Sequence, residues 1–237
     1  MLSILSSELL KLRKTAVWFL VVLGPVGVVA LQAVNFTLRY DYLIPLYADD
    51  LWGGLIENVR ALTVPTLMIG LTIISSLAAN IEHQTNAWKM NAALPVPKGY
   101  LFAAKFATIC FLLLVSCVLL VLGTLTLGIA LGFDAGDVPA AKLLESALYP
   151  YFASVTFVAL QVWLSVTVKN QAVALTVGIM GTVFSLFGLL LPDWTPWKWP
   201  HLDNEWEQPA YSAAAGLGLG MLLFAAGAAH FVRKDVL

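Results

Sequence analysis

The chain has 237 residues, of which 60% are hydrophobic and only 11% are charged, and its mean hydropathy is +0.85. Soluble domains average about 25% charged residues, so this composition excludes an ordinary soluble enzyme and indicates a protein built for a bilayer. The net charge of −1 identifies no partner, and we expect no nucleic acid among the partners.

Residues 1–14 are expected to form an amphipathic helix that lies in the membrane interface. Its apolar and polar positions separate at helical spacing: Leu2, Leu5, Leu9 and Leu12 on one face, and Ser6, Ser7, Lys11 and Lys14 elsewhere. Anionic lipid favours the basic end of such a helix. The alternative is that these residues are only the cytoplasmic overhang of the first membrane span.

Six apolar stretches are long enough to cross about 30 Å of hydrocarbon, which takes roughly 20 helical residues. They are residues 16–38, 59–79, 101–132, 148–168, 172–191 and 210–232. The third is over-long, so it either tilts or extends into an interfacial segment. The predicted fold class is an all-α integral membrane protein with six transmembrane helices, forming a single domain over residues 1–237 without a separate soluble domain.

The distribution of Lys and Arg places both termini in the cytoplasm. Cytoplasmic parts then carry Lys11, Arg13, Lys14, Lys89, Lys98, Lys105, Lys169, Arg233 and Lys234, and external parts carry Arg39, Arg60, Lys142 and Lys198. Arg60, Lys105 and His230 lie near the predicted membrane boundaries, where such side chains snorkel towards water. Few ionisable groups lie inside the spans, which disfavours an ion-coupled carrier.

Two predicted external loops, residues 39–58 and 192–209, combine acidic residues with aromatic ones. The aromatic residues include Tyr40, Tyr42, Tyr47 and Trp52 in the first loop and Trp194, Trp197, Trp199 and Trp206 in the second. The simpler interpretation is a belt at headgroup level. The alternative is an outer lid, or a patch for a cationic amphiphilic substrate.

Two glycine patterns allow close helix contact, and they suggest a dimer seam only weakly because such patterns are frequent in membrane helices. They are Gly128-x-x-x-Gly132 and Gly216-x-Gly218-x-Gly220.

The candidate site is the polar segment between the second and third spans, residues 81–99. It begins with Glu82 and His83 and reads as a helix through about Asn91, before two prolines stop any helix. Trp88 offers an anchor for a soluble partner, and polar contacts of Glu82 and Lys89 would fix the alignment of that partner. The alternative is that Glu82 and His83 solvate a helix end and Trp88 belongs to an aromatic belt.

No Gly-rich Lys-Ser/Thr phosphate loop, no Cys/His cluster with metal spacing and no serine nucleophile elbow or paired intramembrane carboxylates occur in the sequence. We therefore predict that the chain is not an enzyme. Catalytic residues, a metal site and a cofactor of its own are not expected, and an intramembrane enzyme has no constellation to support it.

Several sequence motifs, together with the number and orientation of the predicted spans, form a recognisable arrangement. They are the N-terminal Glu8-Leu-Leu-Lys-Leu-Arg13, six spans with both ends inside, Glu82-His-Gln-Thr-Asn-Ala-Trp-Lys89, Leu94-Pro-Val-Pro-Lys98, and Lys105 at the opening of the third span. This layout resembles the permease subunits of ABC-2-type exporters over nearly the full chain. The resemblance is greatest to the small permeases related to lantibiotic-immunity and bacitracin-resistance transporters.

The resemblance implies that residues 81–99 are the segment that couples to an ATPase subunit, with Glu82, His83, Trp88 and Lys89 as the site residues. It implies an ABC ATPase that carries ATP and Mg, a second permease chain (a homodimer or a sister permease), membrane lipid, and a hydrophobic or peptide substrate. The expected location is the bacterial cytoplasmic (inner) membrane.

The expected function is to move or clear a hydrophobic or amphiphilic compound, or an antimicrobial peptide, as the permease of an ATP-driven exporter. The alternative is a non-transporting membrane sensor or assembly factor that binds another cytoplasmic partner through residues 81–99.

Overall fold

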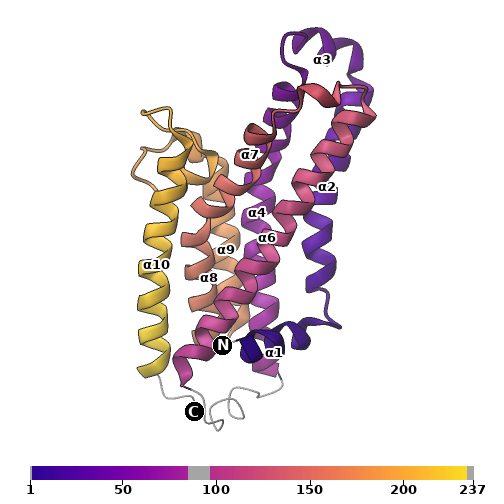
Figure 1. Cartoon of the computed structure of the whole chain (residues 1–237). Helices are drawn as coiled ribbons and strands as arrows, with labels where there is room; N and C mark the ends of the chain where they lie inside the picture. Colours follow the sequence, from indigo (N-terminus) through magenta and orange to yellow (C-terminus); the bar gives the residue numbers. More distant parts are fainter. Residues whose placement is uncertain (1, 85–96, 234–237) are drawn as a thin grey trace.

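The computed structural model describes residues 2–84 and 97–233, and these residues form helices and loops without a strand (Figure 1). The α-helices are α1 (Leu2–Leu12), α2 (Val17–Leu38), α3 (Tyr40–Leu46), α4 (Leu51–Gln84), α6 (Lys98–Ala130), α7 (Ala140–Ala153), α8 (Val155–Thr167), α9 (Gln171–Leu186) and α10 (Pro209–Arg233). Short 3-10 helices are η1 (Ala135–Asp137), η2 (Gly188–Leu190) and η3 (Trp199–His201).

Of the helices in the described part of the chain, α2, α4, α6 and α10 are each long and apolar enough to cross a membrane. α7 and α8 are bent by 40° at a break and together form a fifth candidate. α9 is apolar but has 16 residues, fewer than the roughly 20 that a perpendicular span needs. The six predicted stretches thus fall on helices, of which only four are single helices of spanning length.

α4 is the most buried of the long helices. Of its most apolar stretch 56% is buried, against 28% for α2, 33% for α6 and 22% for α10. α2, α6, α8 and α9 all pack against α4, and α10 packs against α7 and α8. α6 crosses the bundle diagonally, so its first turns also pack against α10 (Figure 1). α4 is therefore the central helix of the bundle.

α4 also corrects two expectations, because it extends beyond the predicted span at both ends. Trp52, expected in an external aromatic belt, lies in the first turn of α4 and is 3% exposed. Its ring packs edge-on against Phe133 at 5.6 Å, and its indole N–H donates to the Asp134 carbonyl at 2.9 Å. At the other end, Ile81–Gln84 continue α4 and do not begin a separate polar helix.

The second aromatic loop folds back onto α9. Trp199 donates its indole N–H to the Asp193 carbonyl at 2.8 Å, and a ring nitrogen of His201 lies 2.7 Å from the Ser185 carbonyl of α9. Trp194 is 78% exposed, whereas Trp197 is half-buried between Phe157 and Phe184. This loop is a folded cap over one end of the bundle, with one ring turned inward.

Some glycines of the two patterns make close contacts within the chain. A Cβ on Gly216 would lie 2.2 Å from the Ala153 carbonyl oxygen, beside the α7–α8 break, and the Thr156 hydroxyl donates to the Gly216 carbonyl at 2.9 Å. Gly128 makes room for the Trp52 ring, and Gly132 (φ 87°) lies after the end of α6. Gly128 and Gly216 therefore hold helices of one chain together, and the dimer seam that the patterns weakly suggested stays a prediction.

Gly216→Ala is expected to lower the melting temperature, whereas Gly218→Ala is not. The added methyl at Gly216 meets backbone atoms that cannot move aside, and overpacking of this kind costs about 1–3 kcal/mol. Gly218 is exposed on the same helix, and a Cβ there meets nothing within 4 Å. Thermal unfolding in detergent, followed by tryptophan fluorescence, compares the two variants, and equal melting temperatures would contradict the close approach of α10.

Candidate functional site

Four charged side chains meet where α1 crosses the ends of α4 and α6 (Figure 1). Glu8 and Lys11 are three residues apart on α1, so they share one helix face. Glu82 lies in the last turn of α4, and Lys105 lies in the third turn of α6. We call these four residues the ion cluster.

The ion cluster is a closed arrangement in which each lysine contacts both carboxylates. Lys11 pairs with Glu8, and its Nζ lies 2.8 Å from Glu82 Oε1. The Nζ of Lys105 lies 2.9 Å from Glu8 Oε2 and 3.1 Å from Glu82 Oε2. Lys105 also donates to the Ala78 carbonyl of α4 at 3.3 Å. Two acids and two bases sum to zero charge, which is the condition for placing charges where water is scarce.

Burial differs among the four side chains. The exposed fraction is 2% for Glu82, 4% for Lys105, 7% for Glu8 and 32% for Lys11. Lys105 was expected to snorkel to water from the membrane boundary; instead it is buried and ion-paired. The reason is that two carboxylates lie within 3.1 Å of its ammonium group.

The pKa values of the α1 groups follow from this arrangement. Burial alone raises the pKa of Glu8, but the charge of Lys105 and the hydrogen bond from Lys11 outweigh it, so the pKa is lowered. Burial alone lowers the pKa of Lys11, but hydrogen bonds to Glu8 and Glu82 outweigh it, so the pKa is raised. Both groups are held in their charged forms.

His83 connects the end of α4 to the last turn of α8. Its Nε2 lies 3.0 Å from the Ser165 carbonyl, and Gln171 donates to the same carbonyl at 2.8 Å. Deeper in the bundle, the Gln161 amide donates to Ser76 Oγ at 3.3 Å and to the Ala174 carbonyl at 2.9 Å. Polar contacts thus tie α4 to α8 and α9 as well as to α1 and α6.

The predicted site residues therefore have different positions. Glu82 is inside the ion cluster and His83 is bonded to α8, while Trp88 and Lys89 lie outside the described residues, so the coupling role of all four stays a prediction. Sequence reasoning did not assign Glu8, Lys11 or Lys105 to the site. A signal existed, because only Glu8, Glu82 and Asp235 of the 14 acidic residues fall on the basic side of the predicted membrane.

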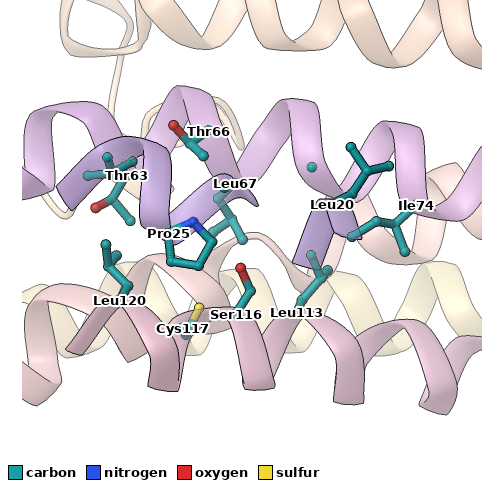
Figure 2. Close-up of a pocket in the computed structure, with 13 residues that line it drawn as sticks. Leu20, Pro25, Thr63, Thr66, Leu67, Ile74, Leu113, Ser116, Cys117 and Leu120 are labelled. Atoms are coloured by element: carbon teal, nitrogen blue, oxygen red, sulfur yellow. The ribbon is translucent and has the colours of Figure 1, made fainter. Parts of the chain in front are cut away.

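No group of three or more His, Cys, Asp or Glu side chains is placed to hold a metal ion within residues 2–84 and 97–233. A cavity of about 40 Å³ lies beside Pro25, between α2, α4 and α6, and Figure 2 shows Thr63, Thr66 and Ser116 around it. Pro25 has no N–H, so it leaves a carbonyl of the preceding turn without its helical donor. The space suits a few water molecules and is too small for a transported compound.

The fold and the site together define a multi-pass membrane protein that is helical throughout its described elements and has an ion-paired junction at one end. Residues 4–188 match the family described as ABC-2 family transporter protein. The chain belongs to this family, whose members are the membrane permease components of ABC transporters and lack the ATPase domain. The comparisons with curated proteins and with solved structures give no match.

Lys105→Met is expected to destabilise the protein more than Lys11→Met. Removing Lys105 leaves two buried carboxylate oxygens without a cation, and breaking a buried pair costs roughly 3–5 kcal/mol. Lys11 is partly exposed, so water replaces it and the cost is roughly 1 kcal/mol. Thermal unfolding in detergent measures both variants.

The pair Glu82→Gln and Lys105→Met completes this test as a double-mutant cycle. Removing both charges leaves Lys11 paired with Glu8, so the double variant should be more stable than the sum of the two single losses predicts. Additive losses would contradict the contact between Glu82 and Lys105.

The pH dependence of the ion cluster is expected to appear at both extremes. Glu8 has a lowered pKa, so its contribution is present above its ordinary pKa of 4.5 and is lost as pH falls through the folded-state value. Lys11 has a raised pKa, so its contribution is present below 10.5 and is lost as pH rises through the folded-state value. The difference in melting temperature between wild type and Glu8→Gln should be constant near neutral pH and shrink below about pH 4.5. An unchanged difference in strong acid would contradict the assignment.

Proposed function

We propose that this ABC transporter permease exports or clears a hydrophobic or amphiphilic compound, or an antimicrobial peptide, across a bacterial cytoplasmic membrane. A separate ATPase subunit, which carries ATP and Mg, supplies the energy through residues 81–99. The lantibiotic-immunity and bacitracin-resistance transporters are the subgroup that the sequence layout favours. Two permease chains, identical or sister chains, complete the assembly.

The observation that carries this proposal is the position of the ion cluster. Glu82 and Lys105 lie on the two helices that flank residues 85–96, and their ion pair holds the end of α4 to the beginning of α6. Glu8 and Lys11 add α1 to the same unit. A force on the segment between α4 and α6 therefore moves three helix ends together, as a rigid-body mechanism requires.

Charge supports the proposed orientation, with the α1 end in the cytoplasm. The described basic residues at that end are Lys11, Arg13, Lys14, Lys98, Lys105, Lys169 and Arg233, and those at the other end are Arg39, Arg60, Lys142 and Lys198. The described part of the chain has Glu8 and Glu82 as its acids at the α1 end, and both are neutralised in the ion cluster. An excess of Lys and Arg marks the cytoplasmic side of membrane proteins.

Exposed apolar side chains support contact with lipid and with a second permease chain. They cover the outer faces of α2 and α9 and include Phe19, Val26, Leu31, Val34, Ile179, Val183 and Leu186. Contiguous apolar surface of this kind on a membrane helix faces hydrocarbon or another helix.

Trp88→Ala is expected to reduce co-purification of an ATPase subunit without lowering the melting temperature. A tryptophan anchor in an interface contributes about 2 kcal/mol or more, which is roughly thirtyfold in affinity. The matched control is Trp194→Ala, which removes a 78% exposed tryptophan at the opposite end of the bundle. The measurement is the stoichiometry of ATPase after purification from native membranes in mild detergent with ATP.

The variant Glu82→Gln distinguishes the role of the ion cluster from the binding of the ATPase subunit. Glu82 is buried, so this variant is expected to retain the ATPase subunit and to lose the effect of the permease on the rate of ATP hydrolysis. Recovery of the wild-type chain without any ATPase would overturn the proposal and favour the sensor or assembly factor.

A further inference from the structure

A second cavity, of about 210 Å³, lies between α4, α8 and α9 in the half of the bundle away from α1. Its lining residues are mostly apolar: Met68, Leu71, Phe157, Leu160, Val177, Gly178, Met180, Gly181, Phe184 and Trp197, with Thr72 and Gln161 as the polar members. The cavity is thus walled by α4, α8 and α9 and by the loop that carries Trp197.

Water is a poor occupant of this cavity. A stable buried water needs two to four polar partners. The Thr72 hydroxyl already donates to the Met68 carbonyl at 2.9 Å, and the Gln161 amide nitrogen donates to Ser76 and Ala174. Apart from the Gln161 side-chain oxygen and the Trp197 indole nitrogen, the remaining lining is hydrocarbon, sulfur and aromatic carbon, so an apolar group gains more from most of this space than water does.

The cavity is open towards the outer face of α9. Val177, Met180 and Phe184 line it and are also 39%, 54% and 56% exposed at the surface of the chain. Side chains that line a cavity and also face outward mark its mouth. In a membrane protein an apolar group enters such a mouth sideways from the bilayer.

Trp197 closes the cavity on the side of the loop, and its indole N–H needs a hydrogen-bond acceptor. Its ring lies 5.8 Å from the Phe157 ring and 6.0 Å from the Phe184 ring, between centroids. Its indole nitrogen is closed to water and has no acceptor among the residues that the structure describes. A buried donor without a partner costs about 1–3 kcal/mol, which an acceptor oxygen on an occupant removes after a small rotation of the ring.

We propose that this cavity binds the aliphatic chain of a membrane amphiphile, with an ester, carboxyl or hydroxyl oxygen of that amphiphile accepting from Trp197. Aromatic and methionine side chains adapt to a flexible hydrocarbon chain, and the indole N–H fixes its polar end. This proposal does not require an ATPase partner, and it applies whether the occupant is the transported compound or a bilayer lipid.

Gly181 offers a way to fill the cavity without disturbing the fold. A Cβ at Gly181 meets only the Trp197 indole nitrogen, at 3.8 Å, which is ordinary van der Waals contact. Gly181→Val therefore places side-chain atoms in the cavity beside the indole. Gly178 is unsuitable, because a Cβ there would lie 2.3 Å from Thr72 and push α9 from α4. The matched control is Gly218→Val, at an exposed glycine of α10 outside the cavity.

The experiment is photolabelling of the purified wild-type chain with palmitic acid that carries a diazirine in its chain, and with a phosphatidylcholine that carries the same group. Adducts are mapped by mass spectrometry of peptides from α4, α8 and α9. We expect saturable labelling there, reduced roughly tenfold in apparent affinity by Gly181→Val, a loss of about 1.4 kcal/mol, and unchanged by Gly218→Val. Labelling by palmitic acid alone identifies a single-chain amphiphile, and labelling by both probes identifies lipid chains in general.

Trp197→Phe tests the polar end separately. This variant keeps a ring in place and removes the N–H, so binding should weaken roughly two- to tenfold, the range of one neutral hydrogen bond. Gly181→Ala replaces Gly181→Val if the valine variant does not elute as a monodisperse protein. Non-saturable labelling in the wild type, or equal labelling of the Gly181 and Gly218 variants, would overturn the proposal.

Discussion

The ion pairing of Glu8, Lys11, Glu82 and Lys105 is the constraint on which the rest of the structure depends. Each buried charge is unfavourable alone, and two acids with two bases become tolerable only when all four meet at hydrogen-bonding distance. That condition places α1 across the ends of α4 and α6 at one defined position. A helix that does not cross the membrane is thereby fixed to two helices that do, at the side of the molecule where the charges of the chain are mainly basic.

In the opposite half of the molecule, close contacts at two glycines fix how the helices pack. Gly216 brings α10 onto the backbone at Ala153, where α7 and α8 bend, and Gly128 receives the Trp52 ring. Backbone contacts of this kind leave no room for rearrangement at those points. The apolar cavity lies elsewhere, where α4 meets α8 and α9.

The long apolar helices were predictable because hydropathy is a property of each segment by itself. α2, α6 and α10 begin and end within a few residues of the predicted spans. The extension of α4 through Trp52 was not predictable, because a tryptophan is equally suited to a membrane interface and to a protein core. Its contacts with Phe133 and Asp134, which only the structure shows, place it in the core. The site was partly predictable: Glu82 stands out as a charge at a helix end. Lys105 and Glu8 are far from Glu82 in the sequence and meet it only through tertiary packing, so no local sequence pattern could predict these contacts.

One helix carries both features of functional interest. Glu82, in the last turn of α4, belongs to the ion cluster, while Met68 and Thr72 on the same helix line the apolar cavity. At 1.5 Å of rise per residue these positions are roughly 15–21 Å apart along α4. The other walls of the cavity are tied to α4 by the contact of His83 with the Ser165 carbonyl and by the Gln161 bonds to Ser76 and Ala174. These contacts join α4 to α8 and α9 both beside the ion cluster, through His83, and at the cavity itself, through Gln161. The ion cluster and the cavity are therefore connected by one continuous set of packed helices.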